Sequence, residues 1–493
     1  MPALWPALPS TALFASPMTP SSPAPANPAA RPRIHTDVYR AVWRWHFYAG
    51  LLVLPFLIWL AVTGGLFVFK DTIDDAFHRE LRFASTSTQP LQPSSQLIAA
   101  ALHAHPGSFV KYTGPSTPGR TAEVGIATAQ GRLLVYVDPK EGTVRGALPE
   151  GGSVAWTIRK LHSLKYFGSI ARGAIEIAAG WAILLVLTGL YLWWPGGRTQ
   201  GVVSVRGTPT QRVFWRDLHA VTGLFVGAAL LFLAITGMPW SVFWGAKANQ
   251  LANGHNFGYP AGVRVQVPMS QARLSDHTTT AWSLQQAQIP QSGPTPADQD
   301  AHAGHAGHAA AMPASPAPTP ADGALDWDAA IAIFDRLGIA QGYTVQPPKG
   351  PTGVYSASIY PHDLDQQRVI HIDQYSGLPL VDMSYQDYGP LGRWLEWGIN
   401  VHLGQEFGVL NQVVLVVACL AIVLLCVSAG TMWWKRRPAK GWGVPPQPQD
   451  ARSLWGVTAL LAVGGVLFPL VGASFLVIAL LDRWLCRPAQ PAA

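Results

Sequence analysis

A run of apolar residues, present in several copies, constrains the fold of this chain more than any other feature of its sequence. One copy occupies Trp43–Phe69 (WRWHFYAGLLVLPFLIWLAVTGGLFVF) and another occupies Phe214–Trp244 (FWRDLHAVTGLFVGAALLFLAITGMPWSVFW). Each is long enough to cross a bilayer, because a spanning helix needs about 20 apolar residues. Of the 493 residues, 49% are hydrophobic and only 12% are charged, whereas soluble domains carry about 25% charged residues. The sequence therefore predicts an integral membrane protein.

Apolar segments of this kind divide the chain into membrane-spanning helices and the loops between them. Transmembrane helices are predicted at 41–70, 172–195, 214–244 and 408–434. A further apolar segment, 453–486, is interrupted by Pro469 and is expected to form either a hairpin or one long helix. Residues 1–40 are rich in Pro, Ala and Ser, and we expect them to form a disordered cytoplasmic tail.

Lysine and arginine residues gather on one side of the predicted helices. They lie before the first helix, in the loop 196–213 and in the loop 435–452. Because basic loops stay in the cytoplasm, the segments 71–171 and 245–407 are predicted to face the periplasm or the cell exterior. The net charge of +7 is thus interpreted as a topology signal. No nucleic-acid partner is expected, because no basic patch is interleaved with aromatic residues.

Each of these two long segments is predicted to contain a small α/β module. The spacing of apolar residues predicts helices at 94–105 and 326–337, and strands at 121–127, 132–138, 353–360 and 367–373. The modules share a turn, since VDPKEG and IDQYSG each place an aspartate four residues before a glycine. The segment 285–322 is rich in Pro, Ala and Gln and is expected to be disordered.

Histidines recur at matched positions in the two halves of the chain. His46 and His219 each precede a threonine at one fixed spacing, and His162 and His402 each precede a tryptophan at another. Such an internal repeat indicates a duplicated unit of helix, outer module and helix. The predicted fold is an α-helical integral membrane protein, a duplicated bundle of four main transmembrane helices with a C-terminal hydrophobic segment and two small α/β modules outside the membrane.

The four histidines form two pairs by predicted depth in the membrane. His46 and His219 lie near the cytoplasmic face, and His162 and His402 lie near the outer face. Two imidazoles can fill both axial positions of a haem iron, which then carries electrons without an open site for oxygen. No CxxCH motif is present, so the pattern predicts two non-covalent, b-type haems. The alternative is that each histidine is an ordinary hydrogen-bonded residue near the membrane surface.

Three further residues are candidates for cofactor binding or proton handling. Arg44 and Arg216 lie just before the first histidine of each half, and would either pair with haem propionates or set the topology. Glu176 lies inside a predicted helix, where an acid is a candidate for proton or cation handling. The alternative for Glu176 is an ion pair with Arg172, four residues earlier.

A histidine-rich tract, AHAGHAGHAAAM, lies in the segment between the modules. Imidazole groups on a flexible segment can bind copper, nickel or iron loosely. The tract would do so through His302, His305, His308 and Met312. The alternative is a low-complexity linker without a metal.

These motifs together resemble the PepSY-associated transmembrane-helix family, whose members are also called iron-regulated membrane proteins. The matching sequences are WRWHFYAGLL, LAVTGGLFVF, DLHAVTGLF, LAITG, LHSLKYFG and VHLGQEFG, with the turns VDPKEGTV and IDQYSGLP, and they cover about 35–440. Members include inner-membrane ferric-siderophore reductases with two b haems. The resemblance implies a protein of the bacterial inner membrane that delivers electrons to periplasmic ferric siderophores, with His46, His219, His162 and His402 as haem ligands.

The electron donor is expected to be a separate molecule, either quinol or a cytoplasmic flavoprotein. Some family members append a nucleotide-binding reductase module, but no GxGxxG follows a predicted strand here. Trp394, Trp397 and Tyr388 are candidates for the substrate surface, with an interfacial aromatic belt as the alternative. Two other functions remain open, namely a haem-free iron or copper binding or transport protein and an interaction protein that acts through its modules.

Overall fold

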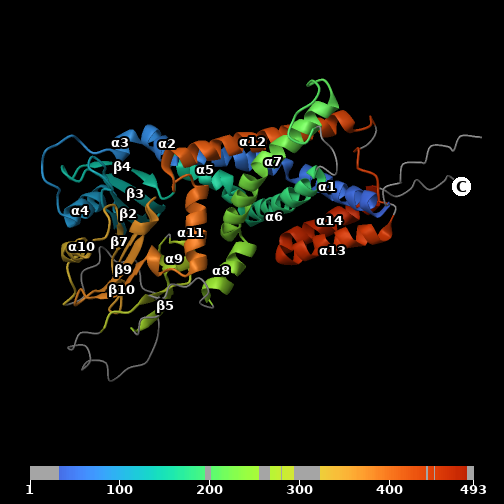
Figure 1. Ribbon diagram of the computed structural model, residues 1–493. Coiled ribbons are helices and arrows are strands. Elements are labelled where there is room, and N and C mark those ends of the chain that lie inside the picture. The colour runs from blue at the N-terminus through green and yellow to red at the C-terminus, as the bar shows by residue number, and fades with distance from the viewer. Residues whose placement is uncertain are drawn as a thin grey trace, which may run out of the picture.

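The computed structural model describes residues 33–194, 201–254, 267–278, 280–293, 323–439, 442–448 and 450–485. It shows an elongated molecule with a helical bundle at one end and a β-sheet domain at the other (Figure 1). Four helices of the bundle are long and apolar enough to cross a membrane. They are α1 (Arg33–Phe67), α6 (Gly168–Trp193), α7 (Arg212–Gly237) and α12 (Gly408–Arg436). Each of the four predicted spans thus overlaps one of these helices, although α7 ends at Gly237 and not at residue 244.

The first helix begins earlier than the sequence pattern predicted. Residues from Arg33 onward are helical, although they fall within the segment expected to be a disordered tail. The reason is tertiary packing, because Asp37 and Ala41 are both buried. The Asp37 carboxylate also accepts a hydrogen bond from the backbone N–H of Asp450, at 3.1 Å.

The helices of the bundle pack closely because small side chains line their contacts. The buried small residues of this core are Ala49, Ala61, Ala178, Ala182, Ala234 and Ala418. Such residues bring helix backbones near one another, and this leaves little room for movement of the side chains placed between the helices.

The C-terminal apolar segment forms a hairpin, which is one of the two arrangements expected from the sequence. Its helices are α13 (Ala451–Leu467) and α14 (Pro469–Leu485). A Cβ atom on Gly465 would lie 2.7 Å from the Cα of Gly472, so the tight approach of the two helices requires glycine. An ion pair between Arg44 and Asp482 ties α14 to α1.

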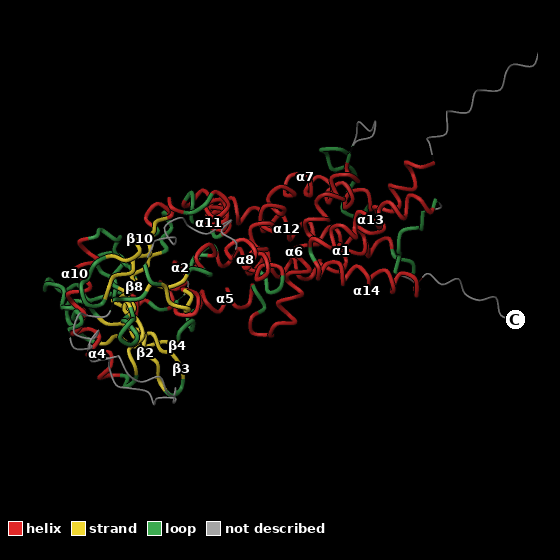
Figure 2. The backbone as a smooth tube through the Cα atoms, turned by 90° about the horizontal axis from the view of Figure 1, so that it is seen from below, coloured by secondary structure: helices red, strands yellow, loops and turns green. Residues whose placement is uncertain are grey.

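The basic segments lie together at the end of the bundle opposite the sheet. The Nζ of Lys435 donates to the carbonyl of Thr210 at 3.1 Å, and the guanidinium of Arg436 lies 5.0 Å from the ring centroids of Trp43 and Phe47. The start of α1, the start of α7 and the end of α12 therefore share one end, which we call the basic end. The other end, next to the β-sheet domain, is called the sheet end (Figure 2).

The two predicted modules are joined edge to edge in a single eight-stranded antiparallel sheet, an arrangement that the sequence pattern does not specify. The order is β10-β9-β8-β7-β1-β2-β3-β4. The strands of the first half are β1 (Ser108–Thr113), β2 (Ala122–Thr128), β3 (Gly131–Val137) and β4 (Val144–Pro149). Those of the second half are β7 (Thr344–Gln346), β8 (Val354–Ile359), β9 (Arg368–Asp373) and β10 (Pro379–Ser384).

The two halves meet where β1 pairs with β7. Tyr112 lies opposite Val345 and Thr113 lies opposite Thr344, and the hydroxyls of the two threonines are 2.8 Å apart. A separate module would leave each of these strands as an unpaired edge, with free backbone N–H and C=O groups. Pairing β1 with β7 provides hydrogen-bond partners for those backbone groups.

Two helices that lie side by side support the junction from one face of the sheet (Figure 1). They are α4 (Ser94–Ala104) and α10 (Trp327–Arg336). The ring of Trp327 lies 5.0 Å from that of Phe109 and 5.9 Å from that of Tyr355, and its Nε1 donates to the Ser94 hydroxyl at 2.9 Å. One indole thus belongs to the cores of both halves.

The shared turn predicted from the sequence is confirmed in both halves. Asp138 accepts hydrogen bonds from the backbone N–H groups of Lys140 and Glu141, and Asp373 accepts them from Tyr375 and Ser376. Each turn ends at a glycine with positive φ, Gly142 at 69° and Gly377 at 70°. Glycine is needed here because side chains are strained in this left-handed region.

Shorter elements connect the bundle to the sheet. The helices among them are α2 (Lys70–Phe77), α3 (Arg79–Arg82), α5 (Val154–His162), α8 (Trp244–Gly254), α9 (Leu274–His277) and α11 (Pro390–His402). A small two-stranded sheet contains β5 (Met269–Arg273) and β6 (Gln288–Pro290). The strand β6 lies within 285–322, so residues 285–293 are ordered where disorder was expected. The rest of that segment, 294–322, lies outside the described residues.

Candidate functional site

Two helices at the sheet end, α5 and α11, each end in one of the predicted histidines. His162 is the last residue of α5 and His402 is the last residue of α11. Two positions later, the chain turns through a left-handed residue, Leu164 (φ 51°) in one case and Gly404 (φ 75°) in the other. Leu164 is the one non-glycine residue with positive φ in the described part of the chain. Such a conformation costs about 1–2 kcal/mol, so this turn is a strained feature placed next to a predicted site.

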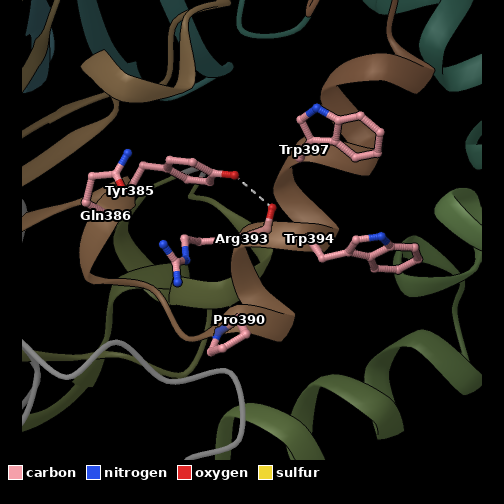
Figure 3. A pocket seen from close by; sticks show the side chains of 6 residues that line it. All are labelled: Tyr385, Gln386, Pro390, Arg393, Trp394 and Trp397. Carbon is pink, nitrogen blue, oxygen red and sulfur yellow. Dashed lines mark hydrogen bonds between the residues drawn. The ribbon is translucent and has the colours of Figure 1, made fainter.

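The helix α11, which lies between the sheet and the bundle (Figure 1), also lines a pocket of about 480 Å³ (Figure 3). Trp394 and Trp397, both predicted as surface candidates, lie on its wall. Tyr388 does not, which corrects that expectation, because its side chain is buried and its hydroxyl accepts a hydrogen bond from Gln367 at 2.8 Å. Tyr385 contributes to the wall instead.

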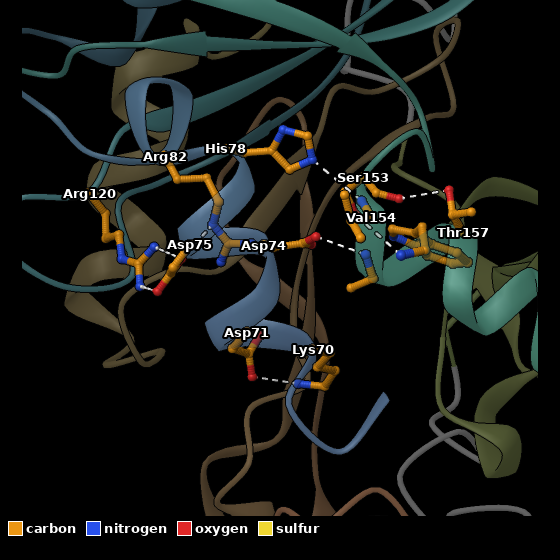
Figure 4. A network of polar contacts seen from close by, with 12 residues as sticks. Lys70, Asp71, Asp74, Asp75, His78, Arg82, Arg120, Ser153, Val154 and Thr157 are labelled. Atoms are coloured by element: carbon orange, nitrogen blue, oxygen red, sulfur yellow. Dashed lines mark hydrogen bonds and ion pairs between the residues drawn. The ribbon is translucent and has the colours of Figure 1, made fainter. Parts of the chain in front are cut away.

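The other helix, α5, is held at its N-terminus by Asp74 of α2 and by its own N-cap residue, Ser153 (Figure 4). Asp74 accepts a hydrogen bond from the backbone N–H of Ala155 at 2.8 Å, and the Ser153 hydroxyl accepts one from Trp156 at 3.3 Å. Side-chain acceptors here satisfy backbone donors that the helix leaves free, and the negative charge of Asp74 favours the helix N-terminus. The position of His162 at the opposite end of α5 is therefore tied to α2, the helix that follows α1 in the chain.

At the basic end, His46 of α1 and His219 of α7 form a pair inside the bundle. Their ring centroids are 6.5 Å apart and the ring planes are inclined by 83°. Metal–imidazole bonds are about 2 Å long. A metal bound between two imidazoles would therefore separate the ring centroids by two such bonds plus, for each ring, the distance from the bound nitrogen to the centroid. The observed spacing agrees with that arrangement.

At the sheet end, His162 and His402 are near enough to interact electrostatically. Burial lowers the pKa of His402 to about 3, and the charge of His162 contributes to that shift. Burial also lowers the pKa of His162 to about 4. Both imidazoles are therefore neutral at physiological pH, which is the form that binds metals.

Three of the four histidines are hydrogen-bonded to a threonine on a neighbouring helix. The Nδ1 to Oγ1 distance is 2.9 Å in each case, for the pairs His46–Thr188, His162–Thr63 and His402–Thr236. Thr63 and Thr236 are the residues that the fixed histidine-to-threonine spacing had singled out. In each half, the fixed spacing therefore runs from the first histidine to the threonine that is hydrogen-bonded to the second histidine.

The threonine hydroxyls determine which ring nitrogen carries the proton. A hydroxyl has one hydrogen to donate, and each hydroxyl already donates it to a carbonyl four residues back, at 2.6–2.7 Å. It must therefore accept from the imidazole, so Nδ1 is protonated. The lone pair is left on Nε2, the nitrogen that remains available to a metal.

The fourth histidine, His219, reaches the same state by a different contact. Its Nδ1 lies 3.1 Å from the carbonyl oxygen of Leu425, and a carbonyl can only accept. The hydroxyl of Ser428 donates to that same carbonyl at 2.8 Å and lies 3.4 Å from Nδ1. Thr188 and Ser428 follow the second histidine of their half at identical spacings, a repeat that had not been recognised in the sequence.

A glycine follows each of the three threonines and makes room for the imidazole. A Cβ atom would lie 3.2 Å from Cε1 of His162 at Gly64, 3.3 Å from Cε1 of His46 at Gly189, and 3.5 Å from Cε1 of His402 at Gly237. Each Thr-Gly pair thus supplies an acceptor for Nδ1 together with space for the ring. All four histidines are half-buried, so each keeps surface on which a ligand could bind.

This arrangement fits axial ligation of haem better than a protein-only metal site. Each location provides two neutral imidazoles with Nε2 free, which is the donor set of a six-coordinate haem. Within the described ranges, no group of three or more His, Cys, Asp or Glu residues could hold a metal ion. The residues that would hold two haems are therefore His46 with His219 and His162 with His402.

The two predicted propionate partners already have anionic partners. Arg44 is buried and paired with Asp482. Arg216 is exposed and bonded to Asp217 at 2.6 Å, and that carboxylate also holds Arg206. A role for either arginine in binding propionates stays a prediction.

The carboxylate of Glu176 is buried at the N-terminus of α8. Its two oxygens accept hydrogen bonds from the backbone N–H groups of Phe243 and Trp244, at 2.8 and 3.1 Å. No ion pair joins it to Arg172 in the described structure. The contacts show an acid that positions α8, and the proton-handling role stays a prediction. The histidine-rich tract, His302 to Met312, lies outside the described residues.

A protein-family model matches most of this chain. The family model described as the PepSY-associated TM region matches residues 43–436, from α1 to the end of α12. No match was found among curated proteins. The match contains all four histidines and both halves of the sheet, as the motif resemblance predicted.

Proposed function

This chain belongs to the PepSY-associated transmembrane family, and from that premise we propose that it is a membrane oxidoreductase with two b-type haems that reduces ferric chelates. Electrons would enter at the basic end and leave at the sheet end. In this proposal, the protein resides in a bacterial inner membrane, with the basic end in the cytoplasm and the sheet domain in the periplasm. The charge pattern of the loops supports that orientation.

The observation that carries the proposal is the hydrogen-bond partner of Nδ1 in each of the four histidines. Every Nδ1 has a hydrogen-bond acceptor on a neighbouring helix, and so every Nε2 keeps its lone pair. Metal-ligating histidines typically donate their other N–H in this way. An ordinary structural histidine would need no such arrangement at four matched positions.

When bound, haem would supply a one-electron carrier. The chain's own residues do the rest. His46 and His219 would hold the haem at the basic end, and His162 and His402 would hold the one at the sheet end. The threonines orient the rings, and the close-packed helices keep both sites in a fixed geometry.

The length of α1 explains why two centres are needed. Thr63, which holds His162, lies nearly five turns beyond His46 on the same helix, or about 25 Å at a rise of 1.5 Å per residue. A single centre would leave most of the membrane to be crossed in one transfer. Two centres divide that distance into shorter steps.

The reaction is a balanced one-electron transfer. A separate donor, quinol or a cytoplasmic flavoprotein, is oxidised at the basic end, and each electron reduces one chelated Fe(III) to Fe(II) at the sheet end. The hard oxygen donors of a siderophore bind Fe(II) less tightly than Fe(III), so the metal is released. No general acid or nucleophile is required from the protein.

An absorbance experiment on the purified protein tests this proposal. We expect a low-spin haem spectrum, a reduced-minus-oxidised difference with two components, and two haems per chain on quantification. The reduced protein should be reoxidised anaerobically by ferric siderophores, in a panel that includes Cu(II) to define the metal. A colourless protein isolated from haem-replete cells would overturn the proposal.

A further inference from the structure

We infer that the pocket on α11 binds an anionic, aryl-bearing chelate of a trivalent metal, an inference that rests on the proposed function and specifies its substrate site. The lining residues are Tyr385, Gln386, Pro390, Arg393, Trp394 and Trp397. Figure 3 shows that they come from α11 and from the segment just before it. The hollow has a volume of about 480 Å³ and is widely open to its surroundings, since Trp394 is 46% exposed and Arg393 is exposed.

The lining combines three aromatic rings with one guanidinium. Tyr385, Trp394 and Trp397 offer flat apolar surfaces on which an aryl group can stack. Arg393 offers a planar set of donors that matches the oxygens of a carboxylate or catecholate. An anionic aryl chelate meets both requirements, whereas a cationic ligand would be repelled by Arg393.

The charge of Arg393 is available to a ligand. The side chain is exposed, and among the described residues it forms no ion pair. The neighbouring acids have other donors, since Asp365 accepts from Gln386 at 2.6 Å, Glu406 from Asn400 at 2.5 Å, and Glu396 from Ser283 at 3.1 Å. Among the described lining residues, Arg393 is therefore the one that carries a charge.

The wall is held in place by contacts on both sides. The hydroxyl of Tyr385 donates to the backbone carbonyl of Arg393 at 2.9 Å, and Glu396 ties α11 to the segment around Ser283. Trp397 packs edge-on against Phe232 of α7, with ring centroids 6.3 Å apart. A preformed pocket loses less free energy on binding than a mobile surface does.

The pocket lies close to the outer histidine pair. Trp397 precedes His402 by five residues on α11, or about 7.5 Å along the helix. The carbonyl of Phe232, whose ring Trp397 contacts, accepts the hydroxyl hydrogen of Thr236, and Thr236 holds His402. A chelate bound here would therefore lie beside the residues that would hold the haem at the sheet end.

Binding of gallium chelates to the full-length protein in nanodiscs tests the inference. Ga(III) resembles Fe(III) in charge and ligand preference but does not accept an electron under these conditions, so calorimetry reads the pocket alone. We expect the gallium tris-catecholate to bind, and Arg393→Gln to weaken it by about 10-fold or more, as for loss of a charge-assisted contact. Trp394→Ala should weaken it by about 5-fold.

Matched variants far from the pocket control for charge and for loss of an indole. Arg336→Gln removes an exposed arginine at the end of α10, and Trp455→Ala removes a tryptophan of α13 that is 70% exposed. Both should leave the gallium Kd unchanged. Equal affinities for wild type and Arg393→Gln would overturn the inference, as would equal binding of an alkyl hydroxamate complex that carries no aryl group.

A second arm of the experiment distinguishes a lipid headgroup from a chelate. Nanodiscs of phosphatidylcholine are compared with discs that contain phosphatidylglycerol. If Arg393→Gln lowers retention of phosphatidylglycerol but leaves gallium binding unchanged, the pocket is a lipid site and the inference is wrong. If the purified protein shows no haem spectrum, the proposed function is overturned. That outcome is distinct from a failure of the inference, because gallium binding is measured without reference to haem.

Discussion

The hydroxyl of Thr63 on α1 lies 2.9 Å from Nδ1 of His162, which stands at the end of α5. The hydroxyl hydrogen is already given to the carbonyl of Trp59, so Thr63 accepts a hydrogen bond from the imidazole. The same relationship joins Thr236 to His402. Each of the helices α1 and α7 thus carries one histidine at the basic end and, further along, the threonine that orients a histidine at the sheet end.

Under the proposed function, replacing Thr63 by alanine should change the electronic properties of one haem without removing it. The hydrogen bond that the imidazole of His162 donates to Thr63 would raise the basicity of a ligating imidazole and so favour Fe(III). Its loss should raise one midpoint potential by roughly 20–60 mV, which corresponds to a hydrogen bond of about 0.5–1.5 kcal/mol. A spectroelectrochemical titration measures both potentials.

Two variants make the result specific to the hydrogen bond. Thr63→Ser keeps the hydroxyl and should restore the wild-type potential. Thr431→Ala removes a hydroxyl on α12 that donates to the carbonyl of Val427, and should move neither potential. A shift of both potentials by Thr63→Ala would contradict the assignment of Thr63 to the site at the sheet end alone.

The membrane helices and the shared turns could be predicted from the sequence because their causes are local. Hydropathy over about 20 residues identifies a span, and an aspartate followed four residues later by a glycine identifies the turn at Asp138 and at Asp373. The proximity of His46 to His219 could also be predicted, because the two histidines occupy matched positions in the two predicted helices. The hydroxyls of Thr188 and Ser428 were within reach of the same reasoning, because they follow the second histidine of each half at identical spacings.

The joining of the two modules could not be predicted, because its cause is long-range. Val345 pairs with Tyr112 although the two belong to different halves of the chain, and nothing in the pattern of either strand specifies the other as its partner. The protonation of the imidazoles likewise requires the directions of individual hydrogen bonds. The true start of α1 at Arg33 depends on the burial of Asp37 against the C-terminal segment.

Single substitutions of the histidines test the pairing. His402→Ala should remove the haem at the sheet end and leave the other, so that the haem content falls by roughly half. His219→Ala should do the same at the basic end, and the two variants should lose different components of the difference spectrum. Loss of both haems, or of neither, from one such substitution would contradict the pairing, and circular dichroism of each variant establishes that the bundle remains folded.

The glycine after each threonine can be tested by adding a methyl group. In Gly64→Ala, the new Cβ would lie 3.2 Å from Cε1 of His162, which is too close for an unstrained contact, and overpacking of this kind costs about 1–3 kcal/mol. We expect weaker retention of the haem proposed at the sheet end, measured by transfer of haem to apomyoglobin. Gly173→Ala is the control, because its Cβ would lie 3.6 Å from Leu470, an ordinary contact, and unchanged retention in both variants would show that the ring has space to move.

The stability of the sheet domain should depend on pH through Asp75. The guanidinium of Arg120, at 2.6 and 2.7 Å, and that of Arg82, at 2.9 Å, hold the pKa of this carboxyl below its usual value, against the opposing effect of burial. A carboxyl whose pKa is lower in the folded state contributes stability above its unfolded pKa of about 3.9, and that stability is lost as the pH falls toward the folded value.

Hydrogen exchange of β2 amides between pH 7 and pH 3 should therefore show less protection at acid pH, and Asp75→Asn should reduce both the protection at pH 7 and its dependence on pH. Glu141→Gln, which neutralises an exposed acid elsewhere in the domain, should change neither quantity, and an equal response from the two variants would mean that the acid effect comes from net charge and not from the contact with Arg120.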